Sequence, residues 1–152
     1  GTQNVAGAAA FAVAAELAVA ELETEAERLR ALRDELVARV RAALPDTSAN
    51  GDPVHRLPGN AHLSFPGAQG DSLLLLLDLA GVAVSTGSAC QAGIPNPSHV
   101  LLAMGRDDDA ARSVLRVTLG RESTHADVDA FVAAIPDAYE RARRAGMSRR
   151  EV

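Results

Sequence analysis

A helical pattern that runs from about residue 4 to residue 44 limits the possible folds of this chain more than any other feature. Apolar side chains recur along it at steps of three and four residues, as on one face of an α-helix. These apolar positions are Leu22, Ala26, Leu29, Leu32, Leu36, Val40 and Leu44. Charged side chains such as Arg33 and Arg39 fall on the other faces, and Pro45 ends the pattern. Because this helix is longer than those of most globular domains, we expect it either to kink or to join two bodies of protein.

The rest of the chain mixes short strands and helices without regular alternation, which favours an α+β fold over a doubly wound sheet. Alternating side chains predict strands over residues 60–65, 82–84 and 113–119, and a further short strand within 47–53. Helices are expected over residues 72–80, 96–104, 107–111 and 124–144.

Local signals indicate where three of these helices begin. Asp71 is the expected cap of the helix over 72–80, whose leucine run is apolar on all sides and should be well buried. Asn96 followed by Pro97 is typical of a helix start. The final helix opens at residues 124–127 with the spacing of a capping box.

Composition excludes several classes of protein. Apolar residues make up 47% and aromatic residues 3%, so the core should consist of small aliphatic side chains, and the net charge of −5 gives no reason to expect a nucleic-acid partner. A single cysteine forms no internal disulfide, which favours a reducing, cytoplasmic setting. The N-terminus lacks the basic residues of a signal peptide, and Glu16 and Glu21 interrupt the alanine-rich stretch, so no membrane span is expected. All 15 basic residues are arginines, so this chain alone cannot form a lysine Schiff base.

The lone cysteine, Cys90, lies in a loop of small and polar residues over 85–93. A lone cysteine is most often a buried small hydrophobe. Thr86, Ser88 and Gln91 are unusual neighbours for a core position, and Gly87 and Gly93 flank the segment. A thiol that attacks a substrate needs access and freedom to move, so the loop sequence favours a reactive cysteine.

Three segments together resemble the group I cysteine desulfurases, which are fold-type I, pyridoxal-phosphate-dependent (PLP-dependent) members of the class V aminotransferase family. They are Ser-Thr-Gly-Ser-Ala-Cys over 85–90, Pro-Ser-His-Val-Leu over 97–101 and Ser-Val-Leu-Arg-Val-Thr-Leu-Gly-Arg over 113–121. The opening Gly-Thr-Gln-Asn and the strand over 60–65 also match in order. The resemblance therefore extends along essentially the whole chain.

The resemblance implies a role for three residues. Cys90 corresponds to the nucleophile that takes sulfur from the substrate and carries it as a persulfide. Arg116 corresponds to the arginine that binds the substrate carboxylate, for which a planar guanidinium is well suited. Thr2 corresponds to the threonine that contacts the PLP phosphate of the neighbouring subunit, although it could simply cap a helix. The 4 histidines (His55, His62, His99 and His125) have no metal-site spacing, so no metal is expected.

The resemblance also implies a domain organisation. Residues 1–44 would form a long interdomain helix and residues 45–152 a small C-terminal α+β domain, in which a mainly antiparallel sheet packs against helices. The N-terminal large domain, with the PLP lysine, would be absent. The chain is therefore expected to be a C-terminal fragment that binds PLP weakly or not at all and does not turn over cysteine alone. The parent would be a cytoplasmic homodimer that converts L-cysteine to L-alanine and passes sulfur to an acceptor scaffold protein.

Other functions are compatible with the residues. The chain could be a non-catalytic module that relays sulfur or docks a scaffold, which the lack of lysine allows. It could be a thiol redox protein with an external resolving cysteine, or part of a related class V enzyme such as a selenocysteine lyase or an aminotransferase. The arginine-rich C-terminus could contact a scaffold, but an arginine-rich helix end that complements the helix dipole is the favoured interpretation.

Overall fold

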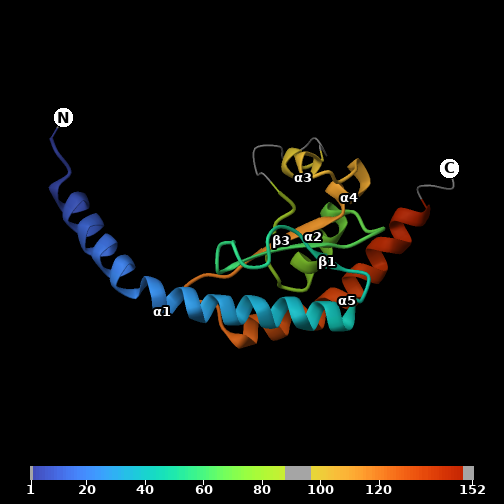
Figure 1. Ribbon diagram of the computed structural model, residues 1–152, viewed down its shortest axis with the longest axis horizontal. Coiled ribbons are helices and arrows are strands. Elements are labelled where there is room, and N and C mark those ends of the chain that lie inside the picture. Colours follow the sequence, from blue (N-terminus) through green and yellow to red (C-terminus); the bar gives the residue numbers. More distant parts are fainter. Residues whose placement is uncertain (1, 88–96, 149–152) are drawn as a thin grey trace.

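The computed structural model describes residues 2–87 and 97–148, with side chains up to residue 145. Its elements show the expected α+β class (Figure 1). In chain order they are α1 (Val5–Ala43), β1 (Ser48–Ala49), β2 (Asn60–Ser64), α2 (Gly70–Leu79), α3 (His99–Ala103), α4 (Asp108–Arg112), β3 (Val114–Thr118) and α5 (His125–Ser148).

The strands form a 3-stranded antiparallel sheet in the order β1-β2-β3. In its register, Ala61 pairs with Val117, and His62 pairs with Arg116. Because side chains alternate along a strand, these two pairs point to opposite faces of the sheet. Ser85 forms an isolated antiparallel bridge to Arg116 and so extends the sheet beyond β3.

One face of the sheet carries the main hydrophobic core. Helices α1, α2 and α5 supply the other side of this core. Its largest fully buried side chains include Leu36, Phe65, Leu73, Leu115 and Phe131. On the opposite face, helices α3 and α4 contribute a smaller cluster made of Leu101, Ala111 and Val114. Aliphatic side chains therefore dominate the interior, as the composition predicts.

Helix α1 is a single continuous helix of 39 residues that curves along its length (Figure 1). Asn4 caps it, because its side-chain oxygen accepts a hydrogen bond from the Gly7 N–H at 2.9 Å. Only the C-terminal half of the predicted apolar stripe is buried in the core, while Leu22 is 64% exposed. The helix therefore does not break, and its N-terminal half extends away from the rest of the structure.

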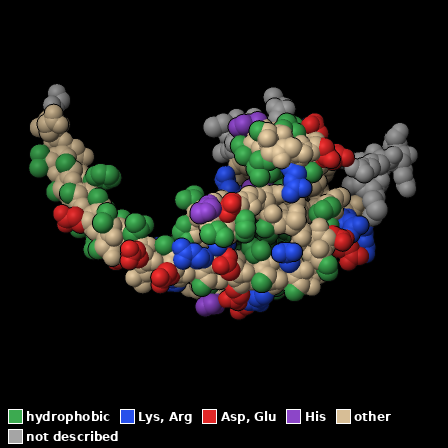
Figure 2. Space-filling view, viewed as in Figure 1, with side chains coloured by type: hydrophobic (Ala, Val, Ile, Leu, Met, Phe, Trp, Pro, Cys, Tyr) green, Lys and Arg blue, Asp and Glu red, His purple; other side chains and the backbone are tan. Residues whose placement is uncertain are grey.

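This free half of α1 is apolar on its surface. Figure 2 shows hydrophobic side chains gathered along it. The exposed large ones are Val5, Phe11, Val13, Leu17, Val19 and Leu22. By length and composition alone α1 is apolar enough to cross a membrane, contrary to the expectation drawn from Glu16 and Glu21. The same composition suits a helix that packs on another protein surface.

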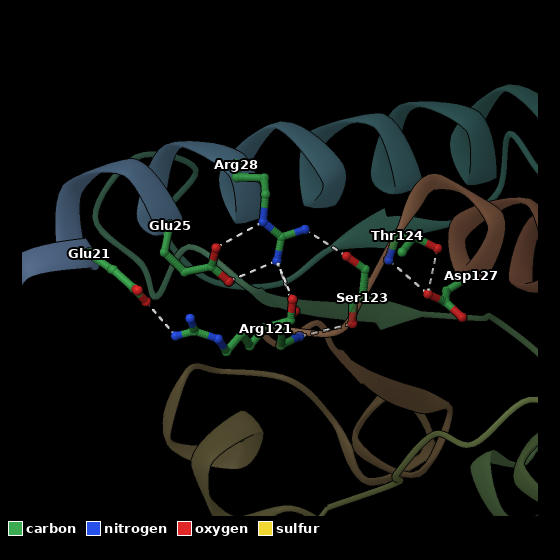
Figure 3. A network of polar contacts seen from close by, with 8 residues as sticks. Glu21, Glu25, Arg28, Arg121, Ser123, Thr124 and Asp127 are labelled. Atoms are coloured by element: carbon green, nitrogen blue, oxygen red, sulfur yellow. Dashed lines mark hydrogen bonds and ion pairs between the residues drawn. The ribbon is translucent and has the colours of Figure 1, made fainter. Parts of the chain in front are cut away.

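A network around Arg28 joins α1 to the turn between β3 and α5 (Figure 3). The Arg28 guanidinium pairs with Glu25 and donates to the backbone carbonyls of Gly120, Arg121 and Ser123 at 3.1, 3.0 and 2.6 Å. Arg121 in turn pairs with Glu21. These contacts fix the turn after the strand that carries Arg116.

Helix α2 differs from the prediction in its cap and in its burial. It begins at Gly70 after Gln69, and Asp71 lies in its first turn rather than at the cap. Leu73 and Leu77 are fully buried, but Leu75 is 58% and Leu79 is 74% exposed. A run of leucines fills every face of a helix, whereas the core covers only one of them. The expectation that this helix is well buried therefore holds only for the face that carries Leu73 and Leu77.

Three further expectations need correction. Residues 82–84 form no strand; the pairing with β3 is made one residue later, by Ser85. Helix α3 begins at His99 and is capped by Ser98, whereas Asn96 lies outside the described residues. Arg33, expected at the surface, is only 4% exposed, because its guanidinium bonds to Asp34 and to the Leu57 carbonyl. These outcomes depend on tertiary contacts that a local pattern does not contain.

The core interpretation predicts a difference between two identical substitutions on α1. Leu36 is 1% exposed, and Leu36→Ala should lower the free energy of unfolding by about 3 kcal/mol, because it leaves a cavity. Leu22→Ala, on the exposed half, should change it by no more than about 0.5 kcal/mol in the 152-residue chain. Denaturant unfolding of both variants checks this; equal losses would contradict the assignment of the core.

Candidate functional site

A row of polar side chains crosses the sheet on the face away from the main core. Its members are neighbours in the strand pairing. The His62 carbonyl accepts from the Asn50 N–H at 2.8 Å, His62 pairs with Arg116, and Arg116 pairs with Ser85. The row Asn50–His62–Arg116–Ser85 thus brings together residues from four separate parts of the sequence.

The backbone of Arg116 makes two hydrogen bonds to Ser85, whereas its side chain makes one hydrogen bond to a described residue. Its N–H donates to the Ser85 carbonyl at 2.6 Å, and its carbonyl accepts from the Ser85 N–H at 3.1 Å. The side chain is half-buried, and its Nη2 donates to the Ser85 hydroxyl at 3.3 Å. In the described part of the chain no carboxylate pairs with this guanidinium. Its remaining donors are therefore available to an anion from outside.

Ser85 and Thr86 anchor the first residues of the cysteine loop. The Ser85 hydroxyl bonds to the Gly87 carbonyl at 3.2 Å, in addition to its contact with Arg116. The Thr86 hydroxyl donates to the Asp71 carboxylate at 3.3 Å. Gly70 lies close by, and a Cβ on it would come within 2.6 Å of the Val114 carbonyl. Close packing of α2 against β3 thus fixes the point at which the loop leaves the sheet.

Asn50 lies at the centre of a buried hydrogen-bond network at the other end of the row. It is 5% exposed, and its amide nitrogen faces the Ser64 hydroxyl at 2.8 Å and His62 Nδ1 at 3.1 Å. Its amide oxygen accepts from Arg106 Nη2 at 3.3 Å, and its backbone carbonyl accepts from Arg56 at 2.6 Å. The network joins the turn before α4 to the sheet.

The row is electropositive. Arg56, Arg106 and Arg116 surround Asn50 and His62, and no described carboxylate forms an ion pair with any of the three. Burial lowers the pKa of His62, and the nearby charges of Arg116 and Arg56 lower it further. His62 is therefore neutral near pH 7, and the site attracts anions.

This lowered pKa predicts how stability depends on pH. In the folded state His62 releases its proton more readily than in the unfolded chain, so between the two pKa values the unfolded chain binds more protons. The stabilising contribution is present above the ordinary histidine pKa of 6.5 and is lost as the pH falls below it. His62→Gln should reduce the loss of stability measured between about pH 7 and pH 5. A variant with the same loss as the parent chain would contradict the shift.

The sequence-predicted site residues are not all brought together. Arg116 lies in the row, beside the start of the cysteine loop. Cys90 lies outside the described residues. Thr2 is exposed and precedes α1, whose N-terminal end lies away from the sheet (Figure 1). The helix cap expected as one possibility for Thr2 is provided by Asn4 instead.

His62 and Asn50 are two candidate residues that the sequence did not single out. Alternation along β2 places the side chains of His62 and Leu63 on opposite faces of the sheet, and this alternation was visible in the sequence. Its position beside Arg116 depends on the register of β2 and β3, which the sequence does not specify. Asn50 belonged to a turn signal, and nothing local indicated that its side chain would be buried.

The described residues also form a hollow that is separate from the polar row. This hollow of about 420 Å³ lies between the end of α1 and α5, and no predicted site residue lines it. Its lining residues are Leu44, Pro45, Asp46, Pro136, Tyr139, Glu140, Arg143 and Arg144. No group of three or more histidine, cysteine or acidic side chains within residues 2–87 and 97–148 is placed to hold a metal ion.

Comparison with known proteins identifies the family. The model of the Aminotransferase class-V family matches residues 1–131, and the chain belongs to this family. An "IscS-like cysteine desulfurase" of Mycobacterium tuberculosis is 53% identical over 150 residues, which cover 97% of this chain and 38% of that protein. "Cysteine desulfurase IscS 1" of Archaeoglobus fulgidus is 41% identical over 143 residues, which cover 94% of this chain and 37% of that protein.

Solved structures agree with the sequence comparison. A protein titled "NIFS-LIKE PROTEIN" has a TM-score of 0.77 and 32% identity, covering 92% of this chain and 35% of its own. A NifS-like protein from Rickettsia africae has a TM-score of 0.78 and 26% identity, covering 92% of this chain and 36% of its own. The chain thus spans less than two fifths of the length of each of these relatives.

Proposed function

We propose that this chain is the C-terminal part of a PLP-dependent cysteine desulfurase, which converts L-cysteine to L-alanine and retains the sulfur as a persulfide on Cys90. The observation that carries the proposal is the position of Arg116. This guanidinium is half-buried, has no described carboxylate partner, and bonds to Ser85, the residue that begins the cysteine loop. The names of the relatives support the same activity.

The proposed reaction balances without an external oxidant. The Cys90 thiol and L-cysteine become the Cys90 persulfide and L-alanine. The carbon–sulfur bond of the substrate breaks, and a sulfur–sulfur bond forms at Cys90. The β-carbon is reduced as it takes up a proton, and the transferred sulfur is oxidised. Arg116 would bind the substrate carboxylate bidentately and so orient the substrate with respect to the loop.

The residues of this chain do not form a complete PLP site. All 15 of its basic residues are arginines, so it offers no amine for a Schiff base to the cofactor. At the start of α1, the Gly7 N–H donates to the Asn4 side chain and is therefore not available to a phosphate group. Thr2, in contrast, is exposed. We infer that another part of the parent protein holds PLP and that Thr2 contacts its phosphate in a homodimer. This chain alone should be inactive.

The exposed half of α1 supports the view that the chain works as part of a larger body. Its apolar side chains are the kind that a second domain or subunit covers. Residues 1–44 would then connect the small domain over 45–152 to the PLP-binding domain, and the C-terminal half of α1 would belong to the small-domain core.

The test is an assay of the full-length protein with PLP and L-cysteine. We expect L-alanine release in proportion to persulfide formed, followed by transfer of that sulfur to an acceptor protein. The 152-residue chain serves as the control and should release no alanine. If the full-length protein released none while the chain accepted sulfur from a separate desulfurase, it would be a relay module instead.

A further inference from the structure

We propose that His62 is a second carboxylate-binding residue, which donates a hydrogen bond from Nε2 to the same carboxylate that Arg116 binds. The inference rests on the proposed function, because the carboxylate is that of the amino-acid substrate. It adds a residue to the site that the sequence motifs do not include.

The hydrogen-bond network determines which nitrogen of His62 carries the proton. Arg106 can only donate, so the atom of Asn50 that faces it at 3.3 Å is the amide oxygen. The amide nitrogen of Asn50 therefore faces His62 Nδ1 at 3.1 Å. Because this NH₂ group can only donate, Nδ1 is the acceptor. A neutral ring in this position carries its proton on Nε2.

The strand register places His62 beside Arg116. Both the N–H and the carbonyl of Arg116 bond to Ser85, on the far side from β2. His62 and Arg116 are therefore a non-hydrogen-bonded antiparallel pair, in which the Cα atoms are about 4.5 Å apart and the side chains approach most closely. Both side chains leave the same face of the sheet, and both are half-buried.

The Nε2–H of His62 is available to a ligand. None of the described residues hydrogen-bonds to it. In the described part of the chain, Asn60 Oδ1 is the one side-chain polar atom that is buried without a hydrogen-bond partner. His62 Nε2 has no partner among the described residues either, so it is not buried and remains accessible. His62 and Arg116 are thus direct neighbours in the strand pairing, and no described carboxylate is paired with either residue.

A carboxylate is the ligand that this pair fits. The guanidinium supplies charge and two parallel donors, and the neutral imidazole adds a third, directional donor without repelling Arg116. An amino alcohol, in which a hydroxymethyl group replaces the carboxylate, loses both the ion pair with Arg116 and the charge-assisted hydrogen bond from His62. His62 should therefore contribute to discrimination in favour of α-amino acids.

The experiment measures competitive inhibition of cysteine turnover in the full-length holoenzyme by two probes, L-alanine and L-alaninol, which differ in the carboxylate. His62→Phe should raise the inhibition constant of L-alanine on the order of tenfold, the usual loss for a hydrogen bond to a charged group. The constant for L-alaninol should not change. His62→Gln, whose amide can donate from a similar position, should stay within about threefold of the wild type for both probes.

Equal changes for the two probes in His62→Phe, or no change for either, would overturn the role of His62, since a structural disturbance does not distinguish a carboxylate. If His62→Gln raised the inhibition constant of L-alanine as much as His62→Phe does, the proposed role of His62 would be overturned as well. These outcomes differ from a failure of the proposed function, in which the wild-type holoenzyme itself releases no alanine and both proposals fall.

Discussion

Replacing Cys90 by alanine in the full-length protein should lower the release of L-alanine from L-cysteine by at least about 10³-fold, the scale seen when a covalent nucleophile is removed. The physical reason is that the sulfur leaving the substrate then has no acceptor. Binding of the substrate does not require the thiol, so the affinity for L-alanine should stay within about threefold of the wild type. Steady-state assays and inhibition by L-alanine measure the two quantities.

The persulfide gives this prediction a direct readout. After exposure to L-cysteine, the wild-type protein should gain about 32 Da at Cys90, the mass of one sulfur atom, and Cys90→Ala should gain none. Cys90→Ser is the matched control, because it keeps the size of the side chain and replaces only the sulfur. Turnover by Cys90→Ser near the wild-type rate would contradict the role of Cys90.

The sequence predicted the fold where the signal is local. Alternation over residues 60–65 and 113–119 identified β2 and β3 to within one residue at each end. One half of the capping box at Thr124 is also found, because the Asp127 carboxylate accepts from the Thr124 N–H at 2.7 Å; the Thr124 hydroxyl donates to the same carboxylate at 2.9 Å. Such features depend on contacts between residues that are close in the chain, and a sequence pattern contains that information.

The errors concern contacts between distant segments. The leucine run of α2 indicates a buried helix but not which leucines face the core, and Leu75 remains 58% exposed. Arg33 is buried because the loop that carries Leu57 covers it, which no periodicity shows. The same limit applies to the site: the resemblance pointed to Arg116, but His62 becomes a candidate only once the register of β2 and β3 is known.

Removing the guanidinium of Arg116 should be the second most damaging change to the proposed reaction. We expect Arg116→Gln to lower kcat/KM for L-cysteine by about 10³-fold, roughly 4 kcal/mol, because a half-buried carboxylate would lose its charged partner. Arg116→Lys keeps the charge but not the planar guanidinium, so its kcat/KM should be only about tenfold higher than that of Arg116→Gln. Neither variant breaks a described ion pair, and both should fold.

Arg41→Gln provides the matched control, since it removes the same charge from an exposed position on α1. It should leave kcat/KM within about twofold of the wild type. An inorganic polysulfide lacks a carboxylate and can transfer one sulfane sulfur atom to the Cys90 thiol, leaving a polysulfide one sulfur shorter. The persulfide that it forms on Cys90 should appear equally well in all three variants, because Arg116 acts on the substrate rather than on the thiol. If Arg116→Gln blocked that labelling too, or lowered kcat/KM no more than Arg41→Gln, Arg116 would not be the carboxylate-binding residue.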